Sequence, residues 1–124
     1  MRILWLALAI PCLSFGHELT PTYPEMRPAY LDGLLVTSMS MFNARQDVDY
    51  YEVGVFSEDW KRVPFASSSK LFHVEHGERV DFDVYIRVVD RDRAFYICTT
   101  SKLLAEPERS NAVISSKVCS RIAK

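Results

Sequence analysis

The chain has 124 residues, a length that fits one domain of ordinary size. Its formal net charge is −1, from 15 lysines and arginines against 16 aspartates and glutamates, and the two signs are interspersed along the sequence. A surface that binds nucleic acid normally carries a basic excess, so we do not expect a nucleic-acid partner.

The N-terminal segment is typical of a secretory signal peptide. Met1 and Arg2 form a small positive region, the apolar run of residues 3–10 follows, and small residues up to Gly16 suit cleavage. This run is far shorter than the roughly 20 residues that span a bilayer. We therefore expect no stable membrane insertion once the signal has been cleaved.

A lipid anchor on Cys12 is the competing interpretation of the leader, but the bulky, rigid Pro11 stands where the processing enzyme needs a small residue. We therefore predict a signal peptide over residues 1–16 and a single domain over residues 17–124. The product is expected to be secreted or periplasmic.

Beyond the leader, apolar and polar residues alternate with a period of two in short runs separated by turn residues, and no run sustains a helical period. Three prolines make residues 18–32 an interrupted edge strand. The other expected strands are 34–42, 50–56, 60–65, 71–74, 80–88, 94–101 and 112–122. About seven short strands without helices indicate an all-β, immunoglobulin-like antiparallel β-sandwich.

Three of these segments carry more detailed expectations. We expect a polar hairpin loop between strands 34–42 and 50–56. Segment 60–65 contains Pro64, which cannot donate a ladder hydrogen bond, so we place it at a sheet edge. In segment 80–88 one face should be buried and the other solvated, with the buried face formed by Val80, Phe82, Val84, Ile86 and Val88.

Cys98 and Cys119 remain as an even pair in the exported chain, and we expect them to form a disulfide. Both fall on the polar faces of the last two expected strands. If these strands form an antiparallel hairpin with the cysteines opposite each other, the register also pairs Tyr96 with Arg121 and Thr100 with Lys117.

The sequence contains no convincing catalytic or metal-binding motif. His73 and His76 would point to opposite faces of a strand and lack a third ligand, so we expect no metal and no other cofactor. The acidic pairs at 47/49 and 90/92 would lie at opposite ends of a sandwich and are interpreted as turn residues. The three serines at 67–69 lack a nucleophile elbow. We therefore predict that the protein is not an enzyme.

An aromatic-rich stretch between residues 50 and 65 allows two interpretations. Such side chains usually supply a core and its rim, but tyrosine and tryptophan also dominate protein-binding hot spots. The candidate partner-binding residues are Tyr50, Phe56, Trp60, Lys117 and Arg121.

The run from Val36 to Val88, followed by AFYICTTSK and NAVISSKVCSRI, resembles the N-terminal immunoglobulin-like domain of PapD-type periplasmic chaperones and the related major-sperm-protein-like domains. The resemblance rests on Phe42-Asn43, the Tyr-Tyr strand, Val63-Pro64-Phe65, Phe72, Gly77-Glu78-Arg79 and the closing hairpin. Chaperones of this family hold a subunit's C-terminal carboxylate with two basic residues between two domains and lend their last strand by β-augmentation.

The resemblance implies a protein-binding role but does not transfer the family's anchor residues. The closest basic positions are Arg27 and Lys117, and neither lies in a matching motif. This chain is also too short to hold the second domain. We therefore expect chaperone-like binding without the complete apparatus of the family.

The leading functional hypothesis is an exported, non-catalytic binding or structural module that contacts a protein partner through a sheet edge or an aromatic surface. One alternative is a secreted enzyme or inhibitor with a site built from loops, for which the candidates are His73, His76, Asp90 and Asp92. Another is a carbohydrate-binding sandwich, which requires Tyr50 and Trp60 to present flat exposed rings.

Overall fold

The computed structural model describes residues 16–102 and 114–124, so the expected leader lies outside the described residues except for Gly16. No helix in these two ranges is long and apolar enough to cross a membrane. The described elements are β1 (His17–Thr20), β2 (Arg27–Pro28), β3 (Leu34–Asn43), β4 (Tyr50–Phe56), β5 (Leu71–His73), β6 (Arg79–Arg87), the 3-10 helix η1 (Val88–Asp90), β7 (Tyr96–Ser101) and β8 (Lys117–Arg121).

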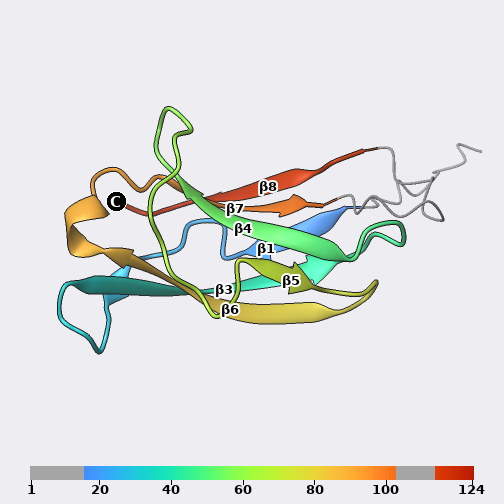
Figure 1. Cartoon of the computed structure of the whole chain (residues 1–124), viewed down its shortest axis with the longest axis horizontal. Helices are drawn as coiled ribbons and strands as arrows, with labels where there is room; N and C mark the ends of the chain where they lie inside the picture. The colour runs from blue at the N-terminus through green and yellow to red at the C-terminus, as the bar shows by residue number, and fades with distance from the viewer. Residues whose placement is uncertain (1–15, 103–113) are drawn as a thin grey trace, which may run out of the picture.

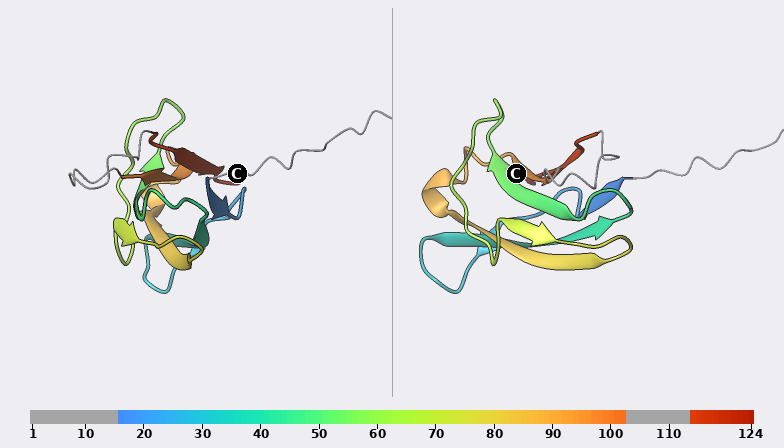
Figure 2. Two further views of the ribbon diagram at one scale, coloured as in Figure 1. Left: turned by 90° about the vertical axis from the view of Figure 1, so that its right-hand side faces the viewer. Right: turned by 45° about the vertical axis from the view of Figure 1, so that its right-hand side comes forward.

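The strands form two antiparallel sheets packed face to face (Figure 1). Sheet A contains β1, β2, β3 and β6, with β3 at its centre, and sheet B has the order β5-β4-β7-β8. Figure 2 shows the two layers from further directions. The predicted all-β, immunoglobulin-like antiparallel sandwich is confirmed.

The expected hairpin between strands 34–42 and 50–56 is wrong. β3 pairs along its length with β6, from Leu34 opposite Arg87 to Phe42 opposite Arg79, whereas β4 pairs with β5 and β7. The connection from Asn43 to Tyr50 therefore crosses from sheet A to sheet B. Alternation in the sequence locates strands and their buried faces, but it does not state which strands pair.

The core lies between the inner faces of the two sheets, as the period of two predicts. Sheet A contributes Met39 and Met41 from β3, and sheet B contributes Tyr51, Val53 and Val55 from β4. The predicted inner face of β6 holds for Phe82, Val84 and Ile86, which are buried, and for Val80, which packs against the core.

Two expectations near the strand ends are wrong. Val88 is 47% exposed because β6 ends at Arg87 and the chain turns into η1. Segment 60–65 forms no strand, but it lies at the edge of sheet B as expected, through an isolated bridge between Phe56 and Arg62 and a hydrogen bond from the Val63 N–H to the Val55 carbonyl. Pro64 follows Val63 and has no amide hydrogen with which to extend this pairing.

Candidate functional site

The C-terminal hairpin of β7 and β8 has the register that the sequence predicted. Cys98 lies opposite Cys119 with a Cα–Cα distance of 4.1 Å, and a disulfide joins them. The neighbouring pairs are Tyr96 opposite Arg121 and Thr100 opposite Lys117. Since the two strands are covalently joined, β8 is held in sheet B although it lies at the sheet's edge.

Along the second half of β8, backbone groups on the outer edge are hydrogen-bonded to another segment of the chain. The Arg121 N–H donates to the Thr22 carbonyl at 3.0 Å, and the Ala123 N–H donates to the Pro24 carbonyl at 2.8 Å. The segment that follows β1 thus covers this part of the edge. The expected edge position of residues 18–32 is borne out, with this segment shared between the two sheets.

Within residues 16–102 and 114–124, the first half of the same edge has no backbone partner. On the inner side, the Ile122 N–H donates to the Phe95 carbonyl, and the Ser116 carbonyl accepts from Ser101. Because backbone groups alternate in direction along a strand, the amides of Lys117 and Cys119 point outward. No backbone group within 16–102 or 114–124 pairs with these two amides.

Four side chains gather on the outer face of sheet B, and we call them the aromatic–cation cluster: Phe56, Trp60, Tyr96 and Lys117. The Trp60 ring stacks on Tyr96, with centroids 4.4 Å apart and planes 6° from parallel. The Lys117 ammonium lies 4.1 Å from the Phe56 ring centroid and 5.0 Å from that of Trp60. The Arg62 guanidinium also lies 5.6 Å from the Phe56 ring centroid. The surface therefore combines apolar area with positive charge, which is the chemistry of binding hot spots.

Trp60 reaches the cluster from the loop that follows β4, which rises above sheet B in Figure 1. Its backbone is left-handed, with φ of 64°, a conformation that costs a non-glycine residue about 1 to 2 kcal/mol. Ser57 holds the turn, because its carbonyl accepts the Trp60 N–H and its Oγ accepts the Lys61 N–H. Trp60 remains 52% exposed.

Of the five candidate partner-binding residues, the structure brings Phe56, Trp60 and Lys117 together. Arg121 lies on the same face, two residues after Cys119 and opposite Tyr96. Tyr50 lies apart and packs against the His73 ring at 4.8 Å, so it forms no ring platform with Trp60. Tyr96 was missed as a candidate, although the predicted register already placed it beside Arg121.

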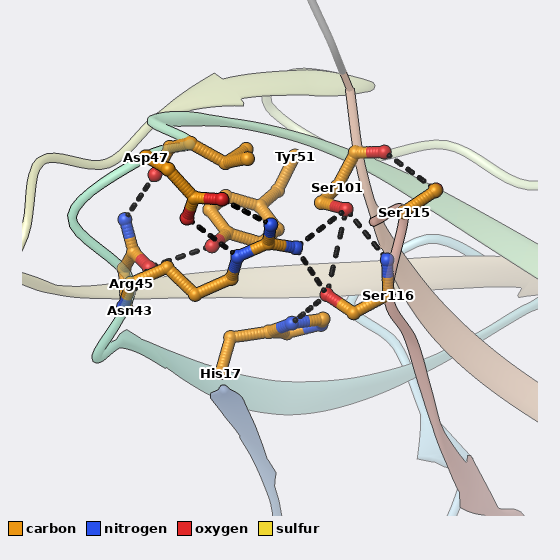
Figure 3. A network of polar contacts seen from close by, with 9 residues as sticks. His17, Asn43, Arg45, Asp47, Tyr51, Ser101, Ser115 and Ser116 are labelled. Carbon is orange, nitrogen blue, oxygen red and sulfur yellow. Dashed lines mark hydrogen bonds and ion pairs between the residues drawn. The ribbon is translucent and has the colours of Figure 1, made fainter. Parts of the chain in front are cut away.

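A buried polar network anchors the beginning of β8 (Figure 3). The Arg45 guanidinium donates to both carboxylate oxygens of Asp47, at 2.8 and 2.6 Å, and to the Ser116 hydroxyl at 3.2 Å. The His17 ring meets the same hydroxyl at 3.1 Å and the Thr99 hydroxyl at 2.9 Å. The network therefore ties β1 and the 43–50 connection to the start of the free edge.

A second part of the network is built on Asn43, whose side chain is completely buried. Its amide donates to the Val48 and Val74 carbonyls, both at 2.8 Å, and its oxygen accepts from the Tyr51 hydroxyl at 2.6 Å. Burial raises the pKa of Tyr51 to about 12, so this hydroxyl stays protonated and remains a donor.

The charged members of the network also shift one another's pKa values. The hydrogen bonds from Arg45 hold the pKa of Asp47 below its ordinary value, and Asp47 in turn raises the pKa of Arg45. Burial lowers the pKa of His17, and the nearby Arg45 charge lowers it further, although its hydrogen bond with the Thr99 backbone acts in the opposite direction. The fold thus favours a neutral His17 beside a permanent cation.

We expect acid to destabilise the protein through His17. Its pKa in the fold lies below the ordinary 6.5, so the unfolded chain binds a proton first and stability falls as the pH drops below 6.5. Urea unfolding at pH 7.5 and pH 5.5 measures this change. His17→Gln should remove most of the difference, and an equal loss of stability in both proteins would contradict the assignment.

The residues considered for a loop-built enzyme site do not come together. His73 ends β5 and pairs with Asp49 at 3.1 Å. η1, which ends at Asp90, lies at the other end of the sandwich (Figure 1). Asp90 is buried, and the Arg87 and Arg93 guanidiniums hold its carboxylate and lower its pKa. No cluster of three or more His, Cys, Asp or Glu side chains suited to a metal ion is found in the described ranges.

Comparison with known proteins supports the architecture. No protein-family profile matches the sequence, and no curated protein matches it significantly. The fold is similar to the crystal structure of the E. coli chaperone DraB, with a TM-score of 0.62 and 18% sequence identity. The match covers 87% of this chain and 53% of that one, so the chain spans about half the length of DraB. The chain therefore shares an immunoglobulin-type sandwich fold with the matched part of this chaperone.

Proposed function

We propose that this chain is an exported, non-catalytic binding module that receives an extended segment of a partner protein along the free half of the β8 edge. The main support for this proposal is that the outward-pointing amides of Lys117 and Cys119 have no backbone partner in the described chain. An extended segment that pairs there continues sheet B by one strand, which is the β-augmentation mode of recognition.

The aromatic–cation cluster supports the same proposal, because Lys117 belongs both to the free edge and to the cluster. Main-chain pairing supplies affinity without much sequence preference, whereas neighbouring side-chain surfaces supply specificity. The half-exposed Trp60 indole beside this edge offers an apolar contact for one side chain of the partner. The chaperone-like fold is consistent with a protein as the partner.

Lys117→Pro tests the edge with little damage to the fold. Lys117 is the first residue of β8, a position where proline is tolerated, and its amide does not pair with β7. We would select 12-residue peptides against the folded protein by display and measure their affinity. Loss of the amide leaves a peptide carbonyl unpaired, so affinity should fall about 10-fold or more.

Lys117→Ala is the matched control, since it removes the cation and retains the amide. It should weaken the same peptides only a few-fold. Hydrogen exchange should also show that bound peptide protects the amides of Lys117 and Cys119. Peptides that bind the proline variant as well as the wild type, and protect another strand, would refute pairing at this edge.

A further inference from the structure

A trough of about 1000 Å³ lies across the outer face of sheet A, and we call it the sheet A trough. It is lined from β1 and the turn after it, from β3 and β6, and from residues 66–68. This last segment lies beside β6, because Ala66 and Tyr85 exchange two backbone hydrogen bonds, at 2.9 and 2.8 Å. Four neighbouring segments spaced about 4.8 Å apart make the trough about 14 Å wide.

The floor of the trough is formed by outward-pointing side chains of β3 and β6. Ser38 lies opposite Asp83, and Ser40 lies opposite Asp81. The residues that alternate with these four point into the core. Ser38, Asp81 and Asp83 are exposed and Ser40 is half-buried, so a ligand can reach all four side chains.

The charge on this floor is negative. Asp81 and Asp83 are the charged residues that line the trough, and neither forms an ion pair within residues 16–102 and 114–124. Asp83 accepts a hydrogen bond from the Ser38 hydroxyl at 2.7 Å. Arg79 borders the trough, where it lies 5.4 Å from the Phe42 ring centroid and donates to the Ser40 hydroxyl at 3.2 Å. The floor therefore offers carboxylate oxygens to a bound cation.

Hydroxyl groups are the second feature of the trough. Six of its twelve lining residues carry one: Thr20, Ser38, Ser40, Ser67, Ser68 and Tyr85. The Ser67 hydroxyl is buried, so we assign it no contact with a ligand. Thr20 and Ser68 are exposed, on opposite sides of the trough. Because a hydroxyl both donates and accepts, such a lining suits a ligand that itself carries hydroxyls.

The backbone of the floor is not available to a ligand. The β3 and β6 main chains are hydrogen-bonded to each other in the ladder from Leu34–Arg87 to Phe42–Arg79. An extended peptide lying here would therefore find no strand edge to pair with, unlike at β8. Recognition in the trough depends on side-chain hydroxyls and carboxylates.

We propose that the sheet A trough binds an oligosaccharide of amino sugars, whose rings carry both hydroxyls and protonated amines. The Cα atoms of Asp81 and Asp83 are about 7 Å apart along β6, so one ammonium group can reach both carboxylates. The ring hydroxyls bond to those of Ser40 and Thr20, which lie in one row with Asp81 across the sheet. The width of about 14 Å accommodates about three linked rings.

Binding of chitotriose, a trimer of glucosamine, to the full chain at pH 6 tests the proposal, with amide chemical shifts and calorimetry as readouts. The dissociation constant should be about 1 mM, and the shifts should centre on residues 38–40 and 81–83. Triacetylchitotriose keeps the rings but has no charge, so it should bind at least 10-fold more weakly. Trilysine has the charge without the hydroxyls and should bind several-fold more weakly.

Two aspartate variants separate the trough from general charge effects. Asp83→Asn keeps an acceptor for Ser38 but removes the charge, and it should weaken chitotriose about 5-fold or more. Asp92→Asn, at an exposed turn residue after η1, should change nothing. Triacetylchitotriose or trilysine binding as tightly as chitotriose, equal effects of the two variants, or no shifts at 10 mM ligand would each overturn the proposal. Lys117→Pro should leave this binding intact, so the trough and the β8 edge are tested independently.

Discussion

Replacing Cys98 and Cys119 together by alanine is expected to lower the free energy of unfolding by about 3 kcal/mol. The bond joins residues 21 positions apart and therefore restricts the unfolded chain. It also fastens β8 to β7 at the edge of sheet B, where no other strand of the described part of the chain pairs with the first half of β8. A small sandwich has a limited core, so this loss is a large part of its total stability.

Urea unfolding of the double variant and of the wild type measures the difference. Thr100→Ala, on the same outer face of β7, is the matched control and should change stability by less than about 0.5 kcal/mol. Reduced wild-type protein should unfold at nearly the same urea concentration as the double variant. A double variant as stable as the oxidised wild type would contradict a stabilising bridge.

Asp47→Ala is expected to lower the free energy of unfolding by about 2 to 3 kcal/mol, because it leaves the buried Arg45 guanidinium without its carboxylate partner. The Arg45 side chain is only 7% exposed, whereas that of Asp47 is 36% exposed and already partly screened by water. Because Asp47 is partly exposed, we expect a smaller loss of stability than for a completely buried ion pair. Urea unfolding at pH 7 provides the measurement.

The control for Asp47→Ala is Asp59→Ala, which removes an exposed partner of Lys61 and should have almost no effect. Combining Asp47→Ala with Arg45→Met should recover part of the lost stability, since no unpaired charge remains buried. An Asp47→Ala protein no less stable than Asp59→Ala would show that the Arg45–Asp47 pair does not support the fold.

The sequence predicted those features that follow from local alternation and from covalent pairing. Period-two patterns located β3, β4, β6 and β7, and the cysteine positions predicted the register of the last hairpin. The assignment of β3 and β4 to different sheets could not be predicted in this way. It depends on the long pairing of β3 with β6, a contact between segments far apart in the chain.

The candidate sites were predicted only in part, for the same physical reason. Phe56, Trp60 and Lys117 were recognised by residue type, but Trp60 joins the other two from a loop in which its own backbone is left-handed. Arg45 gives no sign in the sequence that its guanidinium is buried. The sheet A trough depends on the 66–68 segment lying beside β6, a contact that leaves no pattern in the sequence.

Amide hydrogen exchange in the free protein tests the central claim, that half of the β8 edge is open for pairing. The amides of Ser120 and Ile122 face β7, and that of Arg121 pairs with Thr22, so these should exchange slowly. The amides of Lys117 and Cys119 should exchange at rates close to those of an unfolded chain. Slow exchange at Lys117 and Cys119, matching that at Ser120, would mean that the edge is already occupied.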